Sequence, residues 1–155
     1  MRNILIAFAA TIAVAASIQT YALTIDEQVE ALLAKMTLEE KAGQLNQYSG
    51  YEIITGDIDE SKISQRNLLV KKGLVGSVLN VLGTEDVEKA QRYAVEQTRL
   101  GIPLMFAFDV IHGYRTIFPI PLAEAASWDL EAMERSARIA AIEASAAGQN
   151  WTFAP

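Results

Sequence analysis

One aspartate stands at a position where carboxylates of α/β proteins commonly act on ligands. Asp109 directly follows residues 104–108 (LMFAF), a continuous apolar run of strand length. In proteins built on parallel strands, functional groups gather at the carboxyl ends of those strands. An ionised carboxylate accepts hydrogen bonds from two hydroxyl groups, so sugar hydroxyls are natural ligands. The alternative is that Asp109 only caps the following turn, and from the sequence alone we give this alternative about half of the weight.

Two further polar side chains follow Asp109 in the same loop. His112 is the single histidine of the chain and offers a general base, although a hydrogen-bonded structural role is favoured roughly three to one. Arg115 either reaches an acidic group in the pocket or faces solvent, and the sequence favours neither role.

The remaining aromatic and acidic candidates are easier to interpret as structural residues. Trp128 and Trp151 offer platforms on which a sugar could stack, but their positions at a helix start and in a strand favour core packing. Glu124 and Glu143 are the remaining candidates for a second carboxylate. Each falls inside an expected helix, which favours a solvated or ion-paired side chain. The pair of carboxylates that a glycosidase needs is therefore not visible in this chain.

Composition excludes several classes of function. The 155 residues carry 13 Lys and Arg against 19 Asp and Glu, a formal net charge of −6, which argues against nucleic acid or an anionic membrane as partner. There is no cysteine and one histidine, so cysteine-based or multi-histidine metal sites cannot be built. The composition leaves the oligomeric state unspecified.

Residues 1–22 have the pattern of a secretory signal peptide. Arg2 precedes an apolar run over residues 4–16, which is shorter than a membrane-spanning helix requires. Cleavage is expected after Ala22 or Ala16, because small residues precede both positions. An N-terminal anchor or a buried helix is the alternative. The sequence thus predicts a periplasmic or secreted protein whose mature part is residues 23–155, with no membrane association after cleavage.

The mature part alternates expected helices with short apolar strands. Thr24 with Glu27, and Thr37 with Glu40, have the spacing of capping boxes and predict two helix starts. Thr84 is the expected N-cap of a helix that runs to Leu100. The other expected elements are a loop over residues 46–60, helices over 61–72 and 129–147, and strands over 75–82, 104–108 and 151–154.

Alternating strands and helices predict an α/β fold with a parallel sheet. An open doubly wound sheet and a (β/α)₈ TIM-type barrel both satisfy this pattern, but no glycine-rich turn of the nucleotide-binding type directly follows a strand. A full barrel needs about 250 residues. The mature part has 155 − 22 = 133, so the expectation is the N-terminal part of a barrel that is incomplete at its C-terminus.

Five stretches together resemble glycoside hydrolase family 3, and within it the periplasmic β-glucosidases. They occur in the family's order and with its approximate spacing over most of residues 24–155. The stretches are residues 36–44 (MTLEEKAGQ), 101–113 (GIPLMFAFDVIHG), 114–122 (YRTIFPIPL), 125–129 (AASWD) and 151–155 (WTFAP).

This resemblance implies an enzyme that hydrolyses terminal non-reducing β-D-glucosyl residues with retention of configuration, acting on β-glucosides or oligosaccharides without a cofactor. Asp109 matches the family's aspartate that binds hydroxyls of the non-reducing-end sugar. The family's nucleophilic aspartate and its acid/base glutamate would both fall beyond Pro155. The 155 residues are then expected to hold part of the substrate subsite and none of the catalytic pair.

Two alternatives stay open at this point. One is another activity of the same family, such as β-xylosidase or β-N-acetylhexosaminidase. The other is a non-catalytic, sugar-binding remnant, which would expose the edges of an incomplete sheet.

Overall fold

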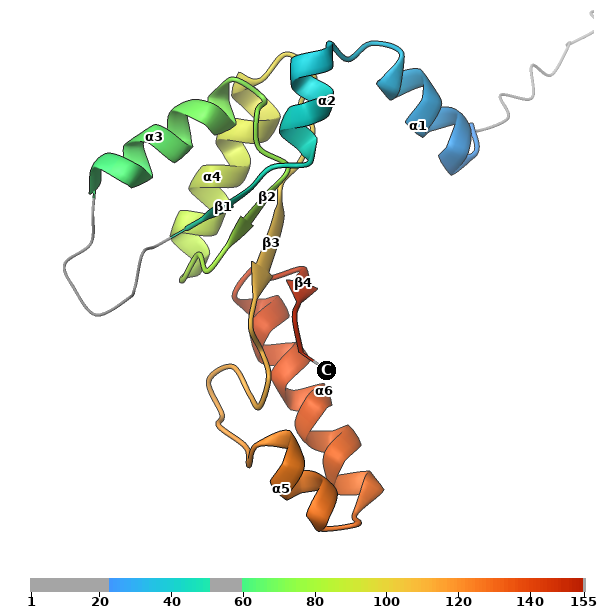
Figure 1. The fold of residues 1–155 in the computed structure, drawn as a ribbon, viewed down its shortest axis with the longest axis vertical. Coiled ribbons are helices and arrows are strands. Elements are labelled where there is room, and N and C mark those ends of the chain that lie inside the picture. The colour runs from blue at the N-terminus through green and yellow to red at the C-terminus, as the bar shows by residue number, and fades with distance from the viewer. Residues whose placement is uncertain (1–22, 51–59, 155) are drawn as a thin grey trace, which may run out of the picture. The chain divides into compact units, whose positions relative to one another are not determined.

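The computed structural model describes residues 23–50 and 60–154. The signal peptide expected at residues 1–22 lies outside the described residues. The chain divides into two units after Ala34. The first contains α1 (Ile25–Leu33), and the second contains all other elements labelled in Figure 1.

Both expected capping boxes are present. The Thr24 hydroxyl accepts a hydrogen bond from the Glu27 N–H at 3.3 Å, and the Glu27 carboxylate accepts one from the Thr24 N–H at 2.8 Å. Thr37 and Glu40 repeat this reciprocal pair at the start of α2 (Leu38–Gln44), with distances of 3.2 and 2.8 Å. Each box satisfies backbone donors that the first helical turn leaves without partners.

Four parallel strands form one sheet in the order of the chain. They are β1 (Gln47–Ser49), β2 (Ser77–Leu79), β3 (Met105–Phe108) and β4 (Trp151–Thr152). Val78 of β2 pairs with Tyr48 of β1 and with Phe106 of β3, and Phe108 of β3 pairs with Thr152 of β4. The expected α/β fold with a parallel sheet is confirmed, and sequential parallel strands are the arrangement found in a TIM-type barrel.

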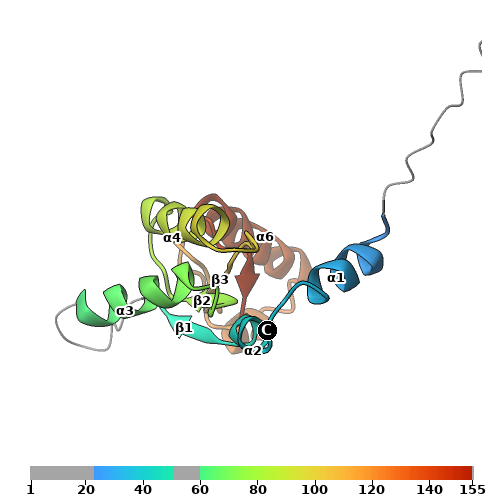
Figure 2. The same ribbon diagram turned by 90° about the horizontal axis from the view of Figure 1, so that it is seen from above.

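Helices connect these strands. They are α3 (Glu60–Lys71), α4 (Thr84–Gln97), α5 (Pro121–Ala126) and α6 (Leu130–Ala146). α3, α4 and α6 cover one face of the sheet, whereas α5 packs on α6. Figure 2 shows α3, α4 and α6 following one another around the strands. None of the helices in the described ranges is both long and apolar enough to cross a bilayer.

Two hydrophobic clusters hold the helices to the sheet. In the larger cluster, Val78 and Phe106 of the sheet pack against apolar residues of α3 and α4. The exposed fractions of these two side chains are 0% and 1%. The smaller one packs Val110 against Ala140 and Ala144 of α6, with Phe108 and Tyr114 at its margin. The second cluster therefore fixes the chain that leaves β3 onto α6.

The expected loop over residues 46–60 is wrong in its first part, because Gln47–Ser49 forms β1. The side chains of β1 lack the apolar content of a buried strand, but the backbone groups of β1 pair with those of β2. The strand expected over residues 75–82 is shorter and ends at Leu79, since Asn80 adopts a positive φ of 61° that no strand residue has.

The expected bounds of α4 need two corrections. Its N-cap is Gly83 rather than Thr84, and Gly83 has a φ of 90° that favours glycine. The helix ends at Gln97 instead of Leu100. Thr98 is extended there, and its hydroxyl donates to the Ala94 carbonyl and accepts from the Gly101 N–H, closing the helix early.

Candidate functional site

Asp109 lies at the carboxyl end of β3, on the sheet face opposite the helices. Phe106, Phe108 and Val110 all belong to the two hydrophobic clusters. Successive side chains of a strand point to opposite faces, so Asp109 shares its face with Met105 and Ala107. The Asp109 side chain is exposed, and it makes no hydrogen bond or ion pair with the residues that the structure describes. Its carboxylate is available to a ligand.

Two residues that the sequence analysis missed flank Asp109 on the neighbouring strands. The Asn80 N–H donates to the Ala107 carbonyl at 2.9 Å, and the Phe153 N–H donates to the Phe108 carbonyl at 3.1 Å. Asn80 thus follows β2, and Phe153 follows β4, at the level where Asp109 leaves β3. The available signals were an asparagine inside an apolar run and an aromatic residue after a tryptophan, and neither is specific.

Core packing was the wrong expectation for Trp151. It is 39% exposed, pairs with Ala107 and therefore lies on the face that holds Asp109. Its ring leans on that of Phe153 with centroids 4.7 Å apart. The two rings form an exposed aromatic surface on the strand next to Asp109, and such surfaces can stack against the apolar face of a sugar.

Core packing was also the wrong expectation for Trp128. It is 89% exposed and has a φ of 56°. The cause is its place in the tight turn between α5 and α6, where a left-handed residue reverses the chain and turns the side chain outward.

The loop after β3, residues 109–120, is closed by contacts of its own and is named here the β3–α5 loop. His112 Nδ1 donates to the Phe118 carbonyl at 3.0 Å, and the Phe118 N–H donates to the His112 carbonyl at 2.8 Å. This agrees with the structural interpretation of His112. Gly113 has a φ of 119°, and a Cβ there would lie 1.9 Å from the Thr116 carbonyl oxygen. Only glycine satisfies both conditions.

Glu143 of α6 binds this loop, so the expectation of a solvated or ion-paired side chain was wrong. Its carboxylate accepts hydrogen bonds from the backbone N–H groups of Arg115 and Thr116, each at 2.8 Å, and from the Thr116 hydroxyl at 2.6 Å. The Thr116 hydroxyl and these backbone donors, with the nearby charge of Arg115, lower the pKa of Glu143 below its usual range. The Arg115 side chain itself is exposed.

Glu124 lies in α5 rather than at the end of β3, where Asp109 lies. It contributes to the wall of a mainly apolar cavity of about 440 Å³ between the β3–α5 loop, α5, α6 and β4. Asp109 does not line this cavity. Glu143 is engaged by the loop, and neither glutamate is hydrogen-bonded to Asp109.

The exposed Asp109 carboxylate can accept hydrogen bonds from hydroxyl groups. Within residues 23–50 and 60–154, no three histidine, cysteine, aspartate or glutamate residues are grouped as metal ligands would be. A retaining glycosidase needs two carboxyl groups about 5–5.5 Å apart. Asp109 and its aromatic neighbours place an exposed carboxylate, which can accept hydrogen bonds, beside a partly exposed ring surface.

The fold and the site together define a class of protein. It is an α/β domain with sequential parallel strands and an exposed carboxylate at the carboxyl end of one of them. The family model for the glycosyl hydrolase family 3 N-terminal domain matches residues 37–155. The chain belongs to this family.

Similar proteins cover most of this chain. The periplasmic β-glucosidase of Salmonella typhimurium is 41% identical over 130 residues, which are 84% of this chain and 16% of that protein. The β-glucosidase of Listeria innocua superposes with a TM-score of 0.71 in its isofagomine complex, at 40% identity, covering 85% of this chain and 18% of that one. Its glucose complex gives 0.72 at 36% identity, with coverages of 85% and 19%. The chain thus spans less than a fifth of the length of these relatives.

Proposed function

We propose that this chain is the N-terminal part of a retaining β-glucosidase and supplies one wall of its sugar subsite. In this proposal Asp109 accepts hydrogen bonds from hydroxyls of the terminal non-reducing β-D-glucosyl residue. The observation that carries it is the exposed Asp109 carboxylate at the end of β3, inside the matched family region. Support also comes from the names of the two relatives described above, which are β-glucosidases, one of them solved with bound glucose.

The proposed mechanism is double displacement. A carboxylate attacks the anomeric carbon while a carboxylic acid protonates the leaving oxygen, and water then releases the sugar with net retention. We infer that both groups come from outside these 155 residues, because the similar proteins are several times longer than this chain. Asp109 would orient the sugar ring for both steps.

We further propose that residues 1–22 direct export to the periplasm or the exterior. The pattern of Arg2, the apolar run and Ala22 supports this, as does the periplasmic name of one relative. The exported protein should begin at Leu23, or at Ser17 if cleavage follows Ala16. Intact mass of the protein recovered from the periplasmic fraction checks this, and an unprocessed N-terminus would contradict it.

Turnover of three aryl glycosides tests the proposed activity. The protein produced from the complete coding region should hydrolyse an aryl β-glucoside with the highest kcat/KM. The β-xyloside lacks the hydroxymethyl group and should be at least about tenfold slower, because each small group lost from a pocket typically costs this much. Proton NMR should show β-glucose as the first product. A higher kcat/KM for the β-xyloside or an N-acetyl-β-glucosaminide, or α-glucose formed first, would overturn the β-glucosidase assignment.

Asp109→Ala in the same protein tests the proposed role of this residue. Hydrogen bonds to a charged group contribute about 1.5–3 kcal/mol each, so the loss of two lowers kcat/KM roughly 100-fold or more. Glu134→Ala is the matched control, because Glu134 is an exposed carboxylate that pairs with Arg138 on α6. Wild-type kcat/KM in folded Asp109→Ala would exclude the role.

A further inference from the structure

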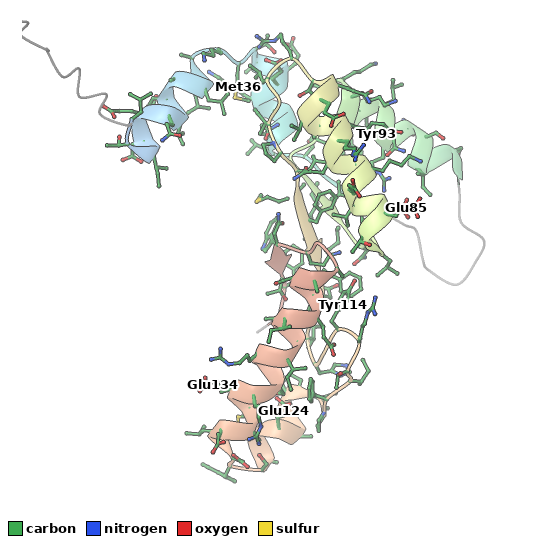
Figure 3. The ribbon with its side chains drawn as sticks, turned by 180° about the vertical axis from the view of Figure 1, so that it is seen from behind. Met36, Glu85, Tyr93, Tyr114, Glu124 and Glu134 are labelled. Atoms are coloured by element: carbon green, nitrogen blue, oxygen red, sulfur yellow. The ribbon has the colours of Figure 1, made fainter. Side chains whose placement is uncertain are left out.

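Glu143 differs from the other glutamates of α6 in what it binds. Glu131 and Glu134 form exposed ion pairs with arginines one turn later, at 3.1 and 3.0 Å. Glu143 instead uses both carboxylate oxygens on two consecutive residues of the β3–α5 loop. Figure 3 shows Glu134 on the side of α6 opposite Tyr114, a residue of that loop.

The place of Glu143 along α6 is unfavourable unless the loop donors are present. It lies in the last turn of the helix, near the negative end of the helix dipole, and no basic residue occupies that turn. Two backbone N–H groups and one hydroxyl compensate the charge at this position. The carboxylate and the loop segment at Arg115 and Thr116 therefore stabilise each other.

Packing alone leaves part of the loop poorly supported. Tyr114 contacts Phe108 edge to face, with ring centroids 5.4 Å apart, and touches the smaller hydrophobic cluster. Residues 111–113 and Phe118 of the loop line the cavity of about 440 Å³, whose other walls include α5 and α6. Close-packed side chains hold a segment in place, whereas a cavity leaves it fewer contacts. The hydrogen bonds of Glu143 add an attachment to α6 at Arg115 and Thr116, in the middle of the loop.

The chain between Asp109 and this clamp is short and anchored at both ends. Phe108 ends β3, and Val110 is buried against Ala140 and Ala144, which lie on the same helix as Glu143. Asp109 is held between these two anchors, and the segment that Glu143 binds begins six residues later. Val110 and the Glu143 clamp thus attach the chain that follows Asp109 to the same helix at two points, and loss of the clamp would leave that attachment to the apolar contacts of Val110 and Tyr114.

We propose that Glu143 is a positioning residue for the sugar subsite: by binding Arg115 and Thr116 it holds the β3–α5 loop, and with it Asp109, in the orientation that receives the sugar. This proposal rests on the proposed function, since it assigns Glu143 to the subsite that Asp109 forms. Glu143 acts through the loop and has no contact with substrate in this account.

Three variants of the protein produced from the complete coding region test the proposal. Glu143→Ala removes all three hydrogen bonds. Glu143→Gln retains the contacts without the charge, because its carbonyl accepts from the two N–H groups and its amide donates to the Thr116 hydroxyl. Glu134→Ala is the control on the opposite side of the same helix.

The measurements are kcat and KM on an aryl β-glucoside and the inhibition constant of glucose, each on protein shown to be folded. Glu143→Ala should raise KM and the glucose inhibition constant at least about tenfold, since small misplacements of positioning groups have such effects. Glu143→Gln should recover most of this loss, and Glu134→Ala should match the wild type. Rescue by glutamine, at an unchanged melting temperature, separates positioning from a general loss of stability.

Each outcome has one meaning. If folded Glu143→Ala binds glucose and turns over substrate like the wild type while Asp109→Ala is impaired, the positioning role is wrong and the subsite stands. If Asp109→Ala is itself unimpaired, the proposed subsite fails first. If Glu143→Ala does not fold, Thr116→Val, which removes one of the three hydrogen bonds, should raise KM by a smaller factor than tenfold, and an unchanged KM overturns the proposal.

Discussion

The alternation of side chains along β3 explains why a charged residue follows so apolar a strand. Phe106 and Phe108 point to the helices and are covered by them, so the next residue on the other face is free of both hydrophobic clusters. The Asp109 side chain is exposed, so this position does not bury a polar group in the hydrophobic core. A shift of one residue in this strand would bury the carboxylate against α6.

Gly113 provides a test of the loop geometry at the scale of one residue. Gly113→Ala adds a Cβ that would meet the Thr116 carbonyl oxygen at 1.9 Å, at a φ of 119°. A positive φ costs a non-glycine residue roughly 1–2 kcal/mol, and the overlap adds about 1–3 kcal/mol because backbone must move. Chemical denaturation of the protein from the complete coding region should show a loss of about 2–5 kcal/mol.

Gly83→Ala is the matched control for this change. Gly83 also has a positive φ, of 90°, but a Cβ there meets nothing within 4 Å. Gly83→Ala should therefore lower the free energy of unfolding only by the cost of the positive φ, about 1–2 kcal/mol. Equal losses for the two variants would mean that the tight contact between Gly113 and Thr116 does not constrain the loop.

At this scale the sequence identified the position of Asp109 and the structural use of His112, and it missed the residues that support them. Asp109 is visible because one charge stands at the end of an apolar run. The hydrogen bonds of Glu143 join residues 27 and 28 positions apart, so no local pattern reveals them. Asn80 and Phe153 join the site through strand pairing, which a single sequence does not specify.

The attachment of the β3–α5 loop to α6 should depend on pH. The pKa of Glu143 in the folded protein lies below its ordinary value because the Thr116 hydroxyl and the loop N–H groups stabilise the charged form, assisted by the charge of Arg115. A lowered pKa contributes stability that is fully present above the ordinary glutamate pKa, about 4.3, and is lost as pH falls through the folded-state value. The loop should therefore loosen only in acid.

Comparison of the wild type with Glu143→Gln isolates this contribution. Glu40 also has a lowered pKa, chiefly through its hydrogen bonds with Arg99, so the wild type loses stability in acid for more than one reason. The difference in unfolding free energy between the two proteins should be constant from pH 7 to 5 and should shrink or reverse below about pH 4. A difference that does not vary with pH would contradict the assigned role of the charge.

Most elements could be predicted from the sequence because their signals are local. Capping boxes at Thr24 and Thr37, and the run before Asp109, each lie within a few residues. β1 could not be predicted, since its polar residues join the sheet only by pairing their backbone with β2. The end of β2 escaped prediction because the positive φ of Asn80 interrupts a run that stays apolar through Leu82.

At the scale of the whole molecule, the sheet presents a face and two edges that a barrel would enclose. β1 and β4 are the outer strands of the described sheet, and Trp151 and Phe153 are partly exposed on the face that holds Asp109. In a closed barrel every strand has two neighbours and this face becomes the interior. The proposed subsite then lies at the carboxyl end of the barrel, where enzymes of this architecture bind their substrates.

A crystal structure, with bound glucose, of the protein produced from the complete coding region would test the proposed subsite most directly. Asp109 should accept hydrogen bonds from two hydroxyls of the sugar, with oxygen–oxygen distances of about 2.5–3.0 Å. Glu143 should still bind the backbone of Arg115 and Thr116 in that complex. A glucose molecule bound in the active site with no hydroxyl within hydrogen-bonding distance of Asp109 would contradict the account.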